Sequence, residues 1–130
     1  MTFIDTNVVL DVLHNDVAWR DWSLEAILAA RGARKIAPVV YAELSGRYAS
    51  RTTLDEELAL LNIEIEEPTR EALYQAGRAH ASYRRQGGTR TRVLPDFLIG
   101  AQAADRRAAL VTRDVRRYRS TFPGVEIVCP

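Results

Sequence analysis

Short apolar segments alternate with longer amphipathic segments along this chain, and that alternation restricts its fold more than any other feature. Apolar runs of three or four residues are typical of buried strands, whereas apolar residues at helical spacing are typical of helices packed on a sheet. The pattern predicts strands at residues 2–4, 35–37, 63–66, 109–112 and 125–128. Strands separated by helices favour an α/β fold with a parallel, helix-covered sheet.

Capping residues, proline and glycine indicate where the helices between these strands begin and end. Asp5-Thr6-Asn7 supplies cap-type residues after the first strand, Pro38 and Pro68 suit helix starts, and Gly32 ends a helix. The helices are predicted at residues 8–13, 17–30, 38–48, 54–61, 69–85, 96–107 and 115–118.

The length of 130 residues suits one core and is too short for two ordinary domains, so we expect residues 1–130 to form one domain. A single cysteine, Cys129, excludes an internal disulfide and a multi-cysteine zinc site. The first residues do not combine a basic stretch with an apolar run, and no apolar run approaches 18 residues. We therefore expect no signal peptide, no membrane span and a cytoplasmic location.

The formal net charge of +1 conceals two halves of opposite sign. Residues 1–65 carry 6 basic and 10 acidic groups, and residues 66–130 carry 12 basic and 7 acidic groups. Residues 78–119 alone contain 11 arginines, while the whole chain has one lysine, Lys35. Arginine makes bidentate contacts with phosphate, which favours a polyanionic partner. The alternative is a solvated helix face in a chain whose arginine content reflects genomic base composition.

Four acidic residues occupy positions that suit a ligand site. Asp5 directly follows a predicted strand, and Asp114 lies two residues after the strand that ends at Thr112. The carboxyl ends of parallel strands form the ligand edge of such sheets. Asp96 falls in the first turn of a helix, and Glu43 is the only acid in an apolar helix, where it needs a partner. Three or four carboxylates together make the oxygen-only site that Mg²⁺ or Mn²⁺ requires.

Each acid also has a purely structural interpretation. Asp5 and Asp114 can act as cap or turn residues, and a carboxylate at the position of Asp96 stabilises a helix N-terminus. Glu43 can pair with Arg47 one helical turn away. The occurrence of all four in one chain favours the metal site over four separate structural roles.

Other catalytic chemistries find less support in the sequence. His14 and His80 lack the spacing of zinc ligands, and Cys129 lies outside any helix start that could activate it. The segment 86–89 lacks the strand and helix context of a phosphate-binding loop. A carboxylate site therefore remains the best supported of these alternatives.

Four segments carry a family resemblance: FIDTNVVL at 3–10, YAEL at 41–44, LPDFLIGA at 94–101 and LVTRD at 110–114. In order and spacing they resemble the PIN-domain ribonucleases, and most closely the VapC toxins of bacterial and archaeal toxin–antitoxin pairs. The resemblance covers nearly the whole chain. It implies a mostly parallel sheet of about five strands with helices on both faces.

The resemblance also implies roles for individual residues. The residues that would bind Mg²⁺ or Mn²⁺ and carry catalysis are Asp5, Glu43, Asp96 and Asp114. Many relatives have asparagine at the last of these positions. Asn7 would support the pocket through hydrogen bonds, and Thr112 would orient a ligand or the attacking water. The predicted RNA contacts are the arginines that flank the Gly87-Gly88 loop, namely Arg84, Arg85, Arg90 and Arg92.

The function implied by the resemblance is that of a metal-dependent endoribonuclease whose products carry 5′-phosphate and 3′-hydroxyl ends. It further implies a homodimer and a VapB-like antitoxin whose tail enters the acidic pocket. One alternative is a non-catalytic PIN-like module that docks an antitoxin or RNA. Another is a metal-dependent phosphatase, although one common type needs an Asp-x-Asp pair where this chain has Asn7.

Overall fold

Five parallel strands form the single sheet of the computed structural model, which describes residues 1–90 and 93–130. The strands are β1 (Thr2–Ile4), β2 (Arg34–Ile36), β3 (Ile63–Ile65), β4 (Ala109–Val111) and β5 (Ile127–Val128). They are arranged in the order β3-β2-β1-β4-β5, and all four neighbouring pairs are parallel. This confirms the predicted parallel α/β fold.

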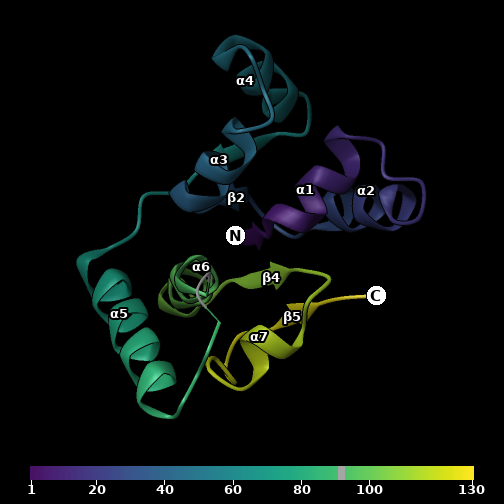
Figure 1. Ribbon diagram of the computed structural model, residues 1–130. Coiled ribbons are helices and arrows are strands. Elements are labelled where there is room, and N and C mark those ends of the chain that lie inside the picture. The colour runs from purple at the N-terminus through teal and green to yellow at the C-terminus, as the bar shows by residue number, and fades with distance from the viewer. Residues whose placement is uncertain (91–92) are drawn as a thin grey trace.

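Seven helices connect and cover these strands in the described part of the chain. They are α1 (Thr6–Leu13), α2 (Arg20–Ala29), α3 (Pro38–Ser45), α4 (Arg51–Leu60), α5 (Arg70–Arg85), α6 (Leu94–Asp105) and α7 (Arg116–Arg119). In Figure 1, α1 to α4 lie above the central strands and α5 to α7 lie below them, so helices cover both faces. None of the helices in the described ranges is long and apolar enough to cross a bilayer.

The helix boundaries differ from the predicted ones where local capping decides them. Helix α2 begins at Arg20 rather than at residue 17, because Asp16 accepts hydrogen bonds from the N–H groups of Ala18 and Trp19 and forms a turn there. Helix α4 begins at Arg51, three residues before the prediction. Its N-cap, Ser50, supplies the side-chain acceptor for that earlier start.

The order of the strands creates one crevice in which a ligand site is expected. From the central strand β1 the chain moves outward through β2 to β3, and it then returns to the other side of β1 to form β4 and β5. The direction reverses between β1 and β4, and ligands bind outside the carboxyl ends of strands at such a switch point. The residues that follow these two strands, Asp5 and 112–114, therefore share the crevice.

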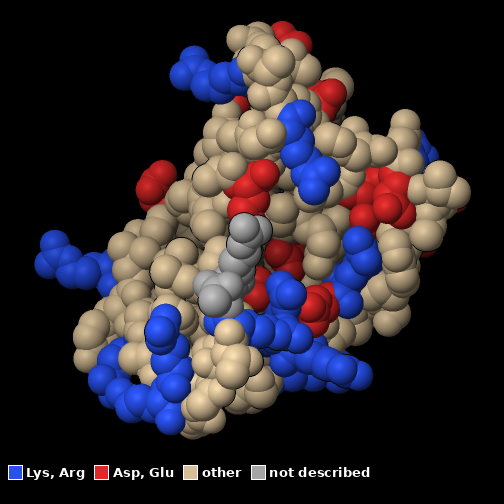
Figure 2. All heavy atoms as spheres, in the orientation of Figure 1, with Lys and Arg blue, Asp and Glu red and all other residues tan. Residues whose placement is uncertain are grey.

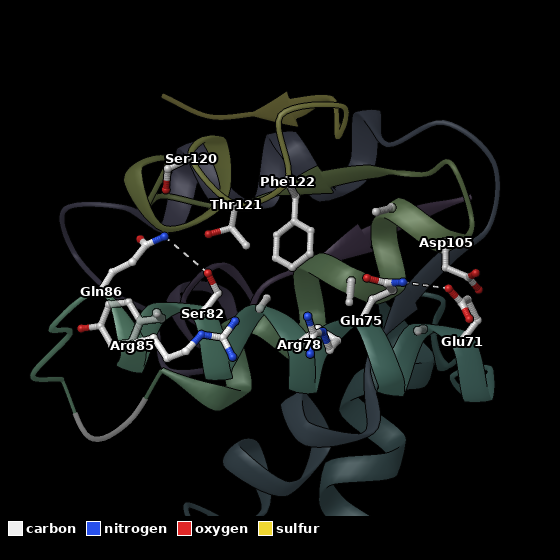
Figure 3. Close-up of a pocket in the computed structure, with 15 residues that line it drawn as sticks. Glu71, Gln75, Arg78, Ser82, Arg85, Gln86, Asp105, Ser120, Thr121 and Phe122 are labelled. Carbon is white, nitrogen blue, oxygen red and sulfur yellow. Dashed lines mark hydrogen bonds between the residues drawn. The ribbon is translucent and has the colours of Figure 1, made fainter.

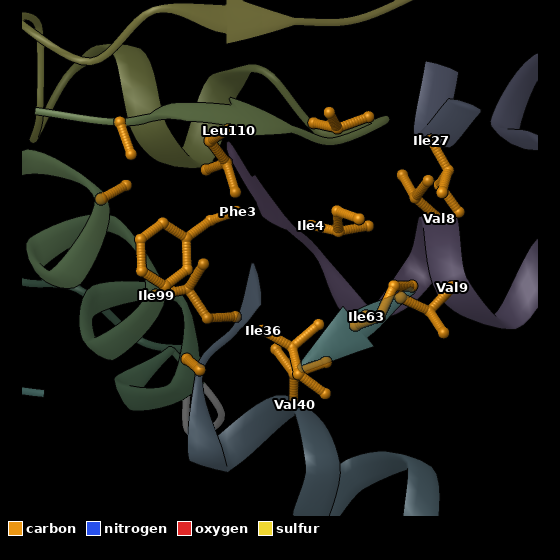
Figure 4. Packing of buried hydrophobic residues seen from close by; sticks show 14 of the residues in the cluster. Phe3, Ile4, Val8, Val9, Ile27, Ile36, Val40, Ile63, Ile99 and Leu110 are labelled. Atoms are coloured by element: carbon orange, nitrogen blue, oxygen red, sulfur yellow. The ribbon is translucent and has the colours of Figure 1, made fainter. Parts of the chain in front are cut away.

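The side chains packed beneath this crevice are apolar and buried. Phe3, Ile4 and Leu110 are fully buried in β1 and β4, and they pack with Val8 of α1 and Ile99 of α6, as Figure 4 shows. Burial of one such side chain contributes roughly 1.5–3 kcal/mol. The strand ends that carry the acidic residues are thus held by a core that contacts helices from both halves of the chain.

Candidate active site

Asp5 is the most tightly held of the four predicted acids. It is 6% exposed and forms the N-cap of α1, where one of its oxygens accepts a 2.7 Å hydrogen bond from the N–H of Thr6. The other oxygen accepts from the hydroxyls of Thr112 at 2.8 Å and Tyr118 at 3.0 Å. Burial raises the pKa of Asp5, while these three hydrogen bonds and the charge of Arg117 oppose the rise. The carboxyl group is therefore fixed in one orientation.

Asp96 lies in the first turn of α6 and is 8% exposed. Burial raises its pKa to about 6, Arg117 opposes the rise, and the charges of three other acids add to it. Those acids are Asp5, Glu43 and Asp114. Direct contacts link all four predicted acids. Thr6 binds both Asp5 and Glu43. Thr112 binds Asp5 and accepts from the N–H of Asp114, and Arg117 pairs with Asp114 and Asp96.

Arg117 joins two of these acids. Its Nη1 lies 3.0 Å from an oxygen of Asp96, and its Nε lies 2.8 Å from an oxygen of Asp114. In the sequence, Arg117 is only one of the 11 arginines within residues 78–119. Its position three residues after Asp114, in the short helix α7, is the signal that could have identified it.

Glu43 differs from its predicted setting. It lies on the exposed side of α3, because the buried face of that helix is made by Val40 and Leu44. Its partner is the hydroxyl of Thr6, which donates a 2.8 Å hydrogen bond to Oε1. The structure shows no ion pair between Glu43 and Arg47 among the described residues, so the proposed structural role is wrong. Glu43 instead faces the start of α1, beside Asp5.

The two predicted supporting residues both connect α1 to the segment after β4. Thr112 is fully buried, and its hydroxyl donates to Asp5 and accepts from the N–H of Asp114 at 3.0 Å. This geometry favours the first predicted role, in which Thr112 orients an acidic ligand. The side-chain oxygen of Asn7 accepts a 3.4 Å hydrogen bond from the N–H of Arg113.

Acidic and basic side chains both gather on one face of the molecule. Figure 2 shows acidic side chains recessed near the middle of this face, with basic side chains gathered below them. Arg116 and Arg117 of α7 lie two and three residues after Asp114 in the chain. A small acidic hollow with a basic margin suits a ligand that brings both a cation and phosphate groups.

A model of the PIN domain matches residues 2–122 of this sequence. The chain belongs to the PIN domain family. The family predicted from the four sequence segments is thereby confirmed, and the acidic crevice lies within the matched region.

Solved structures share the fold of this PIN domain over nearly its full length. A toxin–antitoxin complex from Klebsiella pneumoniae matches with a TM-score of 0.73 and 21% identity, covering 100% of this chain and 98% of that chain. VapBC-1 from nontypeable Haemophilus influenzae matches with a TM-score of 0.72 and 18% identity, covering 98% and 96%. VapBC2 from Rickettsia felis, bound to a promoter DNA fragment, matches with a TM-score of 0.69 and 16% identity, covering 98% and 97%. No curated protein sequence matches this chain significantly.

The acids of the PIN domain fit a divalent cation by their chemistry. Their donors are all carboxylate oxygens, which Mg²⁺ and Mn²⁺ prefer. Burial is the main cause of the raised pKa of Asp96, and the charges of the other acids, which a cation would offset, add to it. Within residues 1–90 and 93–130, no three potential ligand side chains converge on one point as they stand. The guanidinium of Arg117 binds Asp96 and Asp114, so two of the acids already have a cationic partner within the protein. Asp5, Asp96 and Asp114, with Glu43, would hold the metal.

A second charged network, absent from the sequence analysis, supports the same segment of the PIN domain. Arg113 makes a bidentate ion pair with the buried Asp11 of α1, at 2.8 and 3.0 Å. Asp11 also accepts a 2.6 Å hydrogen bond from Ser23 of α2, and the guanidinium of Arg113 lies 5.0 Å from the ring centre of Trp19. This network anchors the residue between Thr112 and Asp114 to the first two helices. The spacing of Asn7 and Asp11, four residues apart on one face of α1, is the sequence signal that could have identified Asp11.

The predicted RNA contacts lie in different places. Arg84 and Arg85 occupy the exposed last turn of α5, whereas Arg90 lines a cavity of about 190 Å³ that also borders Asp96. Arg92 falls outside the described residues. Of the three described arginines, the structure therefore brings Arg90 to the acidic crevice.

A larger cavity lies elsewhere in the PIN domain. It has a volume of about 800 Å³ and runs between α5, α6 and the segment after α7, where Phe122 projects into it (Figure 3). Gln75, Arg78 and Arg85 line it, but none of the four crevice acids does. This cavity is therefore separate from the proposed metal site, although it is larger than the cavity beside Asp96.

Proposed function

We propose that this PIN domain is the toxin of a toxin–antitoxin pair and acts as a Mg²⁺- or Mn²⁺-dependent endoribonuclease that hydrolyses RNA phosphodiester bonds. The observation that carries the proposal is the set of hydrogen bonds and ion pairs that links four carboxylates at the switch point of a parallel sheet. Membership of the PIN family supports a nuclease, and the fold shared with VapBC complexes supports the toxin assignment.

The side chains around the crevice have distinct tasks in this proposal. Thr112, Tyr118 and the N–H of Thr6 hold Asp5 in one orientation, so that its position does not depend on solvent. Asp96 is 8% exposed at the start of α6 and pairs with Arg117. When bound, Mg²⁺ or Mn²⁺ would supply a Lewis acid and a hydroxide nucleophile at neutral pH for hydrolysis of the phosphodiester.

Phosphate contacts come from the basic second half of the chain in this proposal. The predicted contacts remain Arg84, Arg85, Arg90 and Arg92. Binding that depends on such contacts weakens as salt rises, because each phosphate contact releases counterions. The affinity for RNA should therefore fall steeply between low and physiological salt.

The proposed partner is a VapB-like antitoxin, and the acidic crevice suggests how it acts. The guanidinium of Arg117 already sits between Asp96 and Asp114, so a guanidinium group fits this crevice. An arginine on the antitoxin tail would find the same complementary charge. We further propose that the toxin acts in the cytoplasm as a homodimer, which light scattering of the purified chain would test.

Cleavage of RNA by the purified chain tests the proposed function. We expect cleavage with Mg²⁺ or Mn²⁺, no cleavage in excess chelator, and products with 5′-phosphate and 3′-hydroxyl ends. Asp5→Asn and Asp96→Asn should abolish cleavage, whereas Asp105→Asn, at the exposed end of α6, should retain it. Full cleavage in chelator, cyclic phosphate ends, or undiminished activity of the two crevice variants would refute the proposal.

Two outcomes would favour the alternative functions. Absence of cleavage together with tight binding to a small protein partner or RNA would indicate a non-catalytic PIN module. Turnover of a small phosphate ester that depends on Asp5 would instead indicate a phosphatase.

A further inference from the structure

A small cavity opens directly beside the acidic crevice. Its volume is about 190 Å³, and its wall includes Asp96 at the start of α6 together with Arg116 and Arg117 of α7. Arg90 closes it from the segment after α5. A ligand in this cavity would therefore lie next to Asp96 of the catalytic crevice and next to three arginines.

Two of the three arginines are not neutralised by the protein's own acids. Arg117 pairs with Asp96 and Asp114, but Arg90 and Arg116 make no ion pair with a described carboxylate. Both are exposed residues, and both line the cavity. Unpaired guanidinium groups beside a recessed space provide planar donors for a phosphate oxygen.

The remaining walls suit the less polar part of a nucleotide. The side chains of Tyr83, Val93 and Phe97 line the cavity, and the hydroxyls of Ser120 and Thr121 add polar groups. The rings of Tyr83 and Phe97 lie 5.9 Å apart between centres. Aromatic walls next to arginines are a common way in which proteins bind unpaired nucleotides.

Tyr83 also fixes the segment that carries Arg90. Its hydroxyl accepts a 3.0 Å hydrogen bond from the N–H of Arg90, and Gly88 donates its own N–H to the carbonyl of Tyr83 at 3.0 Å. A Cβ atom at Gly88 would overlap the Tyr83 ring, so glycine is required for this close approach. The loop therefore packs against Tyr83, and the hydrogen bond to the Tyr83 hydroxyl fixes the backbone of Arg90 at the edge of the cavity.

We propose that this cavity is a second subsite of the nuclease, which binds the nucleotide adjacent to the cleaved bond and places its flanking phosphate on Arg90 and Arg116. This inference rests on the proposed ribonuclease function. A volume of about 190 Å³ lies below the roughly 300–1,000 Å³ of sites for drug-sized ligands, so the cavity holds only part of one nucleotide, with the phosphate at its edge beside the exposed Arg90 and Arg116.

Binding of RNA in chelator, where the proposed metal-dependent cleavage cannot proceed, tests the subsite without any metal. The probe is a short, fluorescently labelled 2′-O-methyl RNA of mixed sequence, titrated in chelator at several salt concentrations. The Arg90→Gln/Arg116→Gln double variant should bind about 10-fold more weakly at low salt, and its salt slope should be shallower by about 1.4, which is about 0.7 for each lost contact.

Arg119→Gln is the matched control, because Arg119 belongs to the same helix α7 and does not line the cavity. It should leave the salt slope close to that of the wild type, and all variants should unfold at similar temperatures. Equal slopes for the double variant and the wild type would overturn the subsite.

Cleavage of modified substrates then locates the contact. In each of a set of oligonucleotides, one linkage near the cleaved bond is replaced by an uncharged 2′-O-methyl methylphosphonate, with a 2′-O-methyl phosphodiester as the control. The wild type should lose kcat/KM about 10-fold at one linkage next to the cleaved bond, and the double variant should lose this selectivity.

The two proposals fail in different ways. Cleavage by both proteins with the same sensitivity at every linkage would overturn the subsite and leave the nuclease intact. A wild type that cleaves nothing would overturn the nuclease, and the metal-free binding slopes would still decide whether Arg90 and Arg116 contact phosphate.

Discussion

The hydroxyl of Tyr118 donates a 3.0 Å hydrogen bond to Asp5, which lies 113 residues earlier in the chain. Tyr118 is fully buried, and burial together with the charges of Asp5 and Asp96 raises its pKa well above the ordinary value. The hydroxyl therefore remains protonated and acts only as a donor toward this carboxyl group. Through it, the last helix contributes directly to the orientation of the first acid of the crevice.

Tyr118→Phe should weaken both the fold and the activity. It keeps the ring in the core but removes one donor from a buried carboxylate, which costs about 1.5–3 kcal/mol in the free energy of unfolding. RNA cleavage should fall because Asp5 loses part of its fixed orientation. Urea unfolding and initial cleavage rates measure the two effects.

Tyr41→Phe provides the control for that substitution, since the Tyr41 hydroxyl donates to the exposed Asp55, away from the crevice. It should leave cleavage unchanged. A Tyr118→Phe variant as active and as stable as the Tyr41→Phe variant would contradict the role assigned to this hydrogen bond.

Asp96→Asn should stabilise the metal-free protein at neutral pH. The pKa of Asp96 is raised from 3.8 to about 6, so the folded state binds a proton more tightly than the unfolded state. Stability therefore falls as pH rises from about 4 to about 6, and the loss is complete above pH 6. A shift of about two pKa units corresponds to roughly 3 kcal/mol.

The gain from Asp96→Asn should accordingly depend on pH. Thermal unfolding in chelator should show the variant melting above the wild type at pH 7.5 and close to it at pH 4. Asp105→Asn, at the exposed end of α6, should show no such trend. A variant less stable than the wild type at both pH values would contradict the raised pKa.

Arg117→Gln should make metal binding tighter. The guanidinium pairs with Asp96 and Asp114, so it competes with a divalent cation for the same oxygens. Removing this competition should lower the Mn²⁺ concentration that gives half of the thermal stabilisation, by roughly five-fold. A midpoint that moves to higher Mn²⁺, or that equals the midpoint of Arg119→Gln, would show that Arg117 does not compete with the cation.

Asp11→Ala should be strongly destabilising. Asp11 is 2% exposed and pairs in a bidentate manner with Arg113, so its removal leaves a partly buried cation without a partner. Breaking one side of a buried pair costs about 3–5 kcal/mol, whereas loss of an exposed pair costs about 0–1 kcal/mol. Urea unfolding should therefore separate Asp11→Ala from Glu126→Ala, which removes the exposed pair with Arg31.

The double variant Asp11→Ala/Arg113→Ala completes this comparison. Its loss of unfolding free energy should be smaller than the sum of the two single losses, because the second substitution removes the unpaired charge left by the first. Strictly additive losses would show that the two residues do not interact in solution.

Local sequence patterns were enough to predict most of the fold. Each predicted strand and helix is present, because apolar periodicity, proline and cap residues act over a few neighbouring positions. The boundary of α2 was predicted too early, since residues 17–19 form a separate turn in which the Asp16 side chain accepts from the N–H groups of Ala18 and Trp19. Glu43 was expected in an apolar setting, but helical rotation places it on the exposed side of α3.

By itself, the sequence determined the α/β alternation, the position of Asp5 at a strand end, the acidic character of the predicted site and the family resemblance. Only the tertiary structure decided which partners those acids have. Thr112 reaches Asp5 across 107 residues because β1 and β4 are neighbours in the sheet, and Arg117 reaches Asp96 because α7 packs against α6. Strand order and helix packing bring these side chains together, and neither is encoded in the spacing of nearby residues.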